Sequence, residues 1–145
     1  MENNDKFKNL LDKAYENMRM GSYAIDCIME RIKSDDLAEL IRKQNKFYLD
    51  TVLKIEELAR KEGYKLKDIS MMLKGMSYLS IKTKTAINNE TAYLAELLVR
   101  GTTMGITDMI KSKNENPCEN AELLVIVERI ISHEEEFVDS LKTFL

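Results

Sequence analysis

Apolar side chains recur every three or four residues along most of this chain, a spacing that places them on one face of an α-helix. Two such runs come first, separated by Ser34, Asp35 and Asp36, whose side chains are suited to cap a helix N-terminus. The first run consists of Phe7, Leu11, Ala14, Met18, Gly21, Ile25, Ile28 and Ile32. The second consists of Leu37, Ile41, Gln44, Tyr48, Thr51, Ile55 and Leu58. We expect helices over about residues 4–33 and 36–62, packed as an antiparallel hairpin because their connection is short.

The second half of the chain predicts three more helices, over about residues 68–86, 89–113 and 118–144. Asn88 and Asn89 offer N-terminal caps, and Pro117 prevents the preceding helix from continuing. The face of helix 89–113 consists of Leu94, Leu97 or Leu98, Gly101, Met104 or Gly105, and Asp108 or Met109. That of helix 118–144 consists of Leu123, Val127, Ile130, His133 or Glu134, Phe137, Leu141 and Phe144.

These elements predict one all-α domain over residues 1–145. Its four long helices would form a ferritin-like four-helix bundle, in which two antiparallel hairpins are joined by a long crossover that contains the shorter helix 68–86. A bundle with simple up-and-down connections needs only a tight turn there. The roughly 20 residues between the second and third long helices therefore favour the crossover.

Composition narrows the class of protein. Hydrophobic residues make up 44% of the chain, which is too apolar for a disordered protein, and the net charge of −3 does not favour nucleic-acid binding. The chain has no apolar run of the ~20 residues that a bilayer span requires, and its polar N-terminus does not resemble a signal peptide. We expect a cytoplasmic protein with no membrane or nucleic-acid partner, in which Cys27 and Cys118 are reduced thiols.

A ferritin-like bundle raises the question of a di-iron centre. Such centres take a Glu from each of two helices and a Glu-x-x-His pair from each of the other two. The single histidine is His133, and the residue three positions before it is Ile130 rather than Glu. We therefore expect no standard metal site and no cofactor. The weak candidates for a divergent site that holds iron or another divalent metal are His133, Glu134 and Gln44.

Several short motifs resemble a bacterial ferritin-like family that has no assigned function. The resemblance lies in Met20–Ala24, Glu62–Gly63, Lys74–Met76, Val99–Gly101 and His133, and it covers nearly the whole chain. It implies the ferritin-like fold. Members of that family tend to place a Glu directly after the Arg-Gly pair, where this chain has Thr102, so this chain lacks a carboxylate that the resemblance would place in the bundle centre.

Two sets of residues have alternative interpretations. Gln44, Tyr48 and Thr51 place polar atoms on an apolar face, where they are expected to meet His133 and either fix helix register or form a site. The connecting helix is apolar on several sides, which favours a homodimer interface there. The interface candidates are Met71, Met72, Met76, Tyr78 and Leu79.

No serine-nucleophile, P-loop or dinucleotide-binding motif is present, and no set of residues is predicted to be catalytic or to bind a cofactor. The expected function is therefore that of a non-catalytic bundle that acts through assembly or surface interactions. The alternative is a divergent metal-binding ferritin-like protein with a mononuclear or intersubunit site near His133.

Overall fold

Helices account for all the regular structure in the computed structural model, which describes residues 2–69, 80–86 and 88–145. Helix α1 spans Glu2–Ile28 and is followed by the short 3-10 turn η1, Met29–Arg31. Helix α2 spans Asp35–Lys61, α4 spans Thr91–Glu115, and α5 spans Ala121–Lys142. Residues 80–86 form a further helical segment. The prediction of an all-α protein is confirmed.

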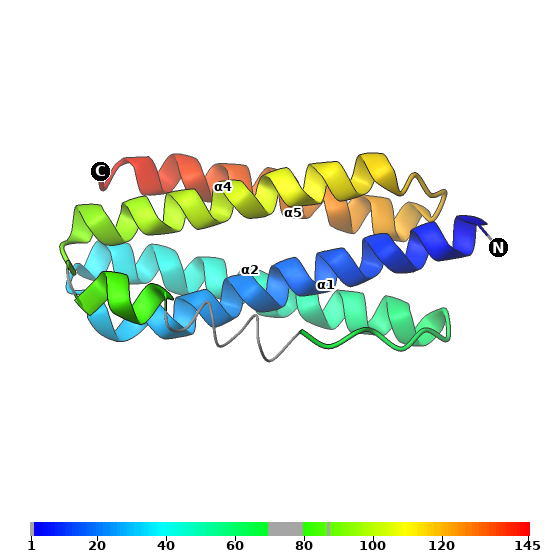
Figure 1. Cartoon of the computed structure of the whole chain (residues 1–145), viewed down its shortest axis with the longest axis horizontal. Helices are drawn as coiled ribbons and strands as arrows, with labels where there is room; N and C mark the ends of the chain where they lie inside the picture. Colours follow the sequence, from blue (N-terminus) through cyan, green and yellow to red (C-terminus); the bar gives the residue numbers. More distant parts are fainter. Residues whose placement is uncertain (1, 70–79, 87) are drawn as a thin grey trace.

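The four long helices lie alongside one another as two antiparallel pairs, α1 with α2 and α4 with α5 (Figure 1). Each pair also packs against the other, through α1 with α4 and α2 with α5. In Figure 1 the N-terminus lies at one end of the helices and the C-terminus at the other. Each long helix therefore faces two neighbours and must bury more than a narrow stripe.

The connection between α2 and α4 is attached to α1 at one end and to η1 at the other. The Asp12 carboxylate of α1 accepts hydrogen bonds from the Tyr64 hydroxyl and, at 3.0 Å, from the backbone N–H of Lys67. Lys82 of segment 80–86 forms an ion pair with Glu30 of η1. Residues 64–69 therefore lie along α1 beyond the end of α2, and segment 80–86 lies at the end of the bundle where α4 begins (Figure 1).

Local sequence explains where most helices begin and end. The Ser34 side chain accepts a hydrogen bond from the Leu37 N–H at 3.2 Å, and Asn120 caps Leu123 in the same way at 2.9 Å. Gly63 adopts the left-handed conformation with φ +66°, which ends α2. At the start of α4 the cap residue is Glu90, two residues later than the first expected asparagine, and Asn88 instead accepts a hydrogen bond from the Glu90 N–H.

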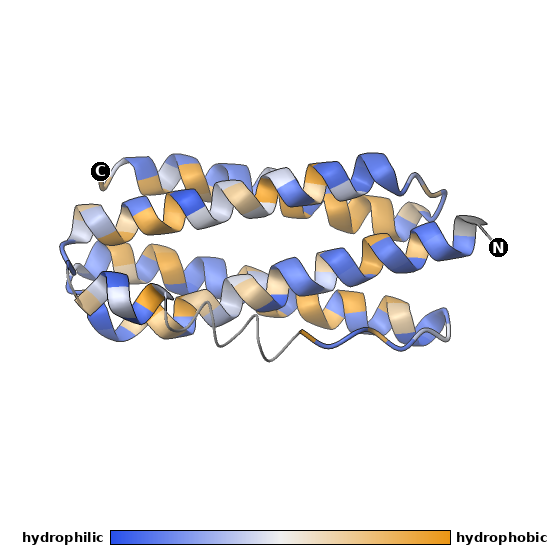
Figure 2. Ribbon diagram, in the orientation of Figure 1, coloured by the Kyte–Doolittle hydropathy of each residue, from blue (hydrophilic) through white to orange (hydrophobic). Residues whose placement is uncertain are grey.

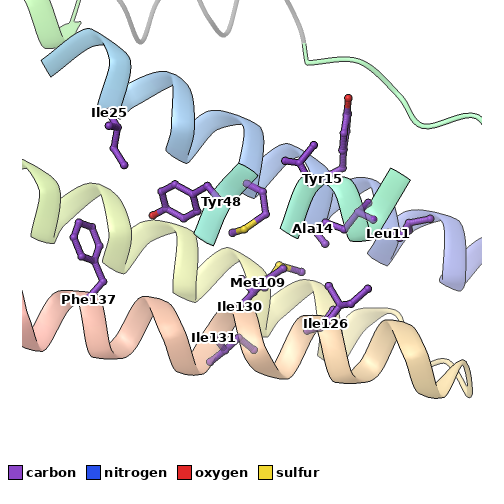
Figure 3. Packing of buried hydrophobic residues seen from close by; sticks show 14 of the residues in the cluster. Leu11, Ala14, Tyr15, Ile25, Tyr48, Met109, Ile126, Ile130, Ile131 and Phe137 are labelled. Carbon is purple, nitrogen blue, oxygen red and sulfur yellow. The ribbon is translucent and has the colours of Figure 1, made fainter. Parts of the chain in front are cut away.

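The predicted interior is largely confirmed, because the apolar faces of the helices point toward one another (Figure 2). Every residue expected on the inner face of α2 is buried. In the first predicted run all residues are buried except Gly21 and Ile32, which are half-buried, and Ile32 lies beyond the end of α1. Figure 3 shows a part of this interior, where α1, α2, α4 and α5 all contribute side chains.

Two expectations need correction. In α4 the expected Leu94 is buried, as are Leu98 and Met109 from the alternatives, but Gly101 is exposed. Of the alternatives Met104 and Gly105, Met104 is 68% exposed and Gly105 is half-buried. The inner face also includes Thr102 and Ser112, which were not expected there. The helix expected over 68–86 does not begin at Asp68, since Asp68 and Ile69 are not helical, and residues 70–79 lie outside the described part.

Within the described residues, no helix is long and apolar enough to span a membrane.

Two glycine substitutions should have opposite effects on stability, one at the contact between α1 and α2 and one at an exposed position on α4. A Cβ atom at Gly21 would lie 2.7 Å from the Tyr48 ring, so Gly21→Ala must displace that buried ring. We expect it to lower the free energy of unfolding by about 1–3 kcal/mol. A Cβ at Gly101 meets nothing within 4 Å, so the matched control Gly101→Ala should raise stability by about 0.5–1 kcal/mol through helix propensity. Urea denaturation of both variants checks this; equal effects would contradict the close packing at Gly21.

Candidate functional site

Midway along the bundle, α2 turns three polar side chains toward the interior. Gln44, Tyr48 and Thr51 are 2%, 3% and 5% exposed, so their predicted burial is confirmed. They share the inner face of α2 because they are three or four residues apart. The Tyr48 ring points into the space between α1 and α4 (Figure 3).

The partner of this layer from α5 is Glu134. Its side chain is 2% exposed, and the Tyr48 hydroxyl donates to its Oε2 across 3.5 Å. The sequence left open whether His133 or Glu134 faces inward, and Tyr48 was expected to meet His133. The structure places the Glu134 carboxyl, and not the His133 ring, beside Tyr48. Glu134 faces inward because it follows the buried Ile130 by one helical turn and precedes the buried Phe137.

His133 points to the side of α5 that borders α2. Its ring is stacked on Phe47 with centroids 3.7 Å apart and planes 1° from parallel. Burial lowers the pKa of His133, and Glu136 acts in the opposite direction. On each of the two helices, a residue near the surface is followed directly by a buried one. Phe47 and His133 pack near the surface, whereas Tyr48 and Glu134 meet in the interior.

A glycine on α4 leaves room for this cluster. A Cβ at Gly105 would lie 3.3 Å from the Asn17 side chain of α1 and 3.5 Å from Glu134 Oε2. The Asn17 amide donates a 2.9 Å hydrogen bond to the Gly105 carbonyl. Sequence reasoning missed Asn17, which precedes the expected core residue Met18 and carries no distinguishing signal. It found Gly105 only as an alternative to Met104.

Burial dominates the electrostatics of the cluster. It raises the pKa of Glu134 to about 8, and the hydrogen bond from Tyr48 offsets only part of this rise. Burial also raises the pKa of the Tyr48 hydroxyl above its usual range, and the Glu134 charge adds to that effect. Thr102 of α4 and Gln44 act on Tyr48 in the opposite direction. At neutral pH the cluster is therefore a set of uncharged groups, with Glu134 mostly protonated.

Two buried polar atoms of the cluster remain unpaired. Glu134 Oε1 and Gln44 Nε2 make no hydrogen bond to any group that the structure describes. Both belong to side chains that are 98% buried, where an unpaired polar atom is costly. The buried polar groups of the cluster therefore form only some of the hydrogen bonds that they could make.

The structure separates the three weak metal candidates. Gln44 and Glu134 lie beside Tyr48 in the interior, whereas His133 is stacked on Phe47. Across residues 2–69, 80–86 and 88–145 no group of three or more His, Cys, Asp or Glu side chains converges in a way that could hold a metal ion. The interface candidates Met71, Met72, Met76, Tyr78 and Leu79 lie outside the described residues.

A surface groove runs between α2 and α5 beside the Phe47–His133 stack. Its volume is about 300 Å³, and Val125 on its wall is 58% exposed. The lining residues are Phe47, Thr51, Lys54, Glu57, Glu122, Val125, Ile126 and Arg129. A shallower hollow next to it includes His133 and Glu136.

Comparisons with known proteins find no matching family model, no matching curated protein and no matching solved structure. The function is therefore argued from the groove and the buried cluster.

The hydrogen bond between Tyr48 and Glu134 is testable by removing one hydroxyl group. Tyr48→Phe keeps the ring but leaves both carboxyl oxygens without a described partner, so the free energy of unfolding should fall by about 0.5–1.5 kcal/mol. Tyr15→Phe is the matched control, because that hydroxyl points away from the interior and water can replace it as the acceptor for Arg19 (Figure 3). Urea denaturation at pH 7 compares the two; equal losses would contradict a specific role for the central hydroxyl.

Proposed function

We propose that this protein is a non-catalytic, ferritin-like helical bundle that acts by assembling through its surface, and that its first partner is a second copy of itself. The observation that carries the proposal is the apolar groove between α2 and α5, whose wall leaves Val125 58% exposed. The order and direction of the helices support the ferritin-like description, since α2 ends and α4 begins at opposite ends of the bundle (Figure 1).

The groove has the composition of a contact surface. Phe47, Val125 and Ile126 supply apolar area, and the charged side chains of both helices surround it. Burying such a surface against a partner removes apolar area from water, which favours association by roughly 25 cal/mol per Å² before the costs of association. The exposed Val125 side chain is the part of this surface that gains most from being shielded from water.

Charge favours a second copy as the occupant. A two-fold interface brings a patch into contact with itself, so that patch needs both signs of charge. Lys54 and Arg129 lie on this groove together with Glu57 and Glu122, one residue of each sign on each helix. Two copies related by a two-fold axis can therefore place acids opposite bases along both helices.

The experiment compares two charge substitutions of exposed apolar residues. Wild-type protein at 10–100 µM should have the mass of a dimer by light scattering. Val125→Glu places a charge in the groove and should weaken the dimer at least tenfold, about 1.4 kcal/mol. Met104→Glu is the matched control, because Met104 is 68% exposed on α4, outside the groove, and it should leave the dimer intact.

Two results would count against this function. A wild-type monomer throughout that concentration range would reject the dimer. A dimer weakened equally by both substitutions would place the contact elsewhere. Circular dichroism of each variant distinguishes lost association from lost folding.

A further inference from the structure

We propose that the centre of this bundle is a proton-binding site, in which Glu134 carries one exchangeable proton whose release loosens the packing of α5 against its neighbours. This inference does not depend on the proposed dimer. It rests on the surroundings of the carboxyl group in the folded chain.

The first step concerns hydrogen bonds. A carboxylate offers several acceptor positions, and a buried one is stable only when donors or a cation occupy them. Glu134 is 2% exposed and accepts one long hydrogen bond, from Tyr48, while its Oε1 has no partner among the described groups. The Asn17 amide donates to the Gly105 carbonyl rather than to Oε1.

The second step concerns charge, taken helix by helix. From α2 the carboxyl meets the neutral Tyr48 hydroxyl, whose neighbour is the Gln44 amide. On the side of α4 the carboxyl lies near Gly105, whose other neighbour is the uncharged Asn17 amide of α1. On α5 itself, the neighbouring His133 is stacked on Phe47, and Glu135 and Glu136 are exposed. None of these groups supplies the positive charge that a buried carboxylate needs.

The third step is the consequence of ionisation. The carboxyl keeps its proton while the bundle is closed, which agrees with the rise of its pKa to about 8 by burial. In the unfolded chain the same group ionises near its ordinary value of 4.5. The folded state therefore binds the extra proton between these values, so this group makes stability fall as pH rises from about 4.5 to 8 and then level off.

Loss of the proton leaves a buried carboxylate, which gains further hydrogen bonds only if water reaches it. Oε1 is already unpaired and buried, so no solvent reaches it in the closed bundle. Hydration of the carboxylate then requires α5 to separate locally from α2 or α4. This local opening is the response that we assign to the site.

Two other groups titrate differently. His133 has a lowered pKa, so protonation of its imidazole disfavours the folded state, and this group makes stability rise rather than fall as pH increases. Burial raises the pKa of Cys27 above its ordinary value of 9.0, so its ionisation lies at higher pH. A decline between pH 5 and 8 is therefore specific to the central carboxyl.

The decisive variant is Glu134→Gln, which matches the shape of the protonated acid and cannot ionise. The unfolding equilibrium constant of the wild type, relative to that of Glu134→Gln, should rise by about tenfold per pH unit between pH 5 and 8. Glu135→Gln is the matched control, because it removes an exposed carboxylate next to Glu134 on the same helix and should retain the wild-type dependence.

A measurement on the folded wild type keeps the inference testable if Glu134→Gln does not fold. Carboxyl ¹³C NMR of glutamate-labelled protein should show one side chain that titrates above pH 7. Tyr48→Phe should shift that titration to higher pH, since the hydroxyl favours the ionised form. Hydrogen exchange of α5 amides should accelerate through the same pH range.

Parallel pH dependences for wild type and Glu134→Gln would overturn the inference. So would a wild-type spectrum in which every glutamate titrates below pH 6. A high titration that persists unchanged in Tyr48→Phe would assign the proton to another carboxyl and would also overturn it.

Discussion

The close approach of α1 and α2 at Gly21 determines the chemistry of the interior. Because Gly21 has no side chain, the Tyr48 ring lies against the backbone of α1, where any Cβ would be 2.7 Å away. The ring is thereby fixed with its hydroxyl toward α5, and the carboxyl of Glu134 is the group that it meets. A wider spacing between the helices would admit water to the same place. Tight packing is thus the reason that this acid is desolvated and holds its proton.

Burying an acid that has only one hydrogen bond lowers the folding stability of a small bundle. A hydrophobic residue of similar volume would fill the same space without an unpaired oxygen, and such replacements are often neutral or stabilising. The cost is consistent with a role in fixing helix register, since Tyr48, Glu134 and Thr102 can meet in only one alignment of α2, α5 and α4. It is equally consistent with a response to pH, and both follow from the same contacts.

Sequence patterns predict this fold where the apolar signal is strong. The inner face of α2 is correct at every position, including the polar Gln44, because large aliphatic residues surround it on one stripe. Helix α4 is misassigned around Gly101 and Met104 because its middle consists of Gly, Thr and Met, which contrast little between faces. The choice between His133 and Glu134 is a rotation of about 100° on α5, which periodicity alone does not resolve. The contribution of Asn17 depends on which helices become neighbours and has no local signature.

The groove and the buried cluster are built from consecutive residues of the same two helices. Phe47 and His133 stack beside the groove, and their chain neighbours Tyr48 and Glu134 meet in the interior. Because a helix moves as a rigid unit over one turn, a change in the distance between α2 and α5 must alter both sites together. An ionised Glu134 that draws water between these helices would displace the wall that carries Val125 and Ile126. A partner held in the groove would in turn resist that separation and favour the protonated acid, which is the reciprocity required of two sites that share one structural element.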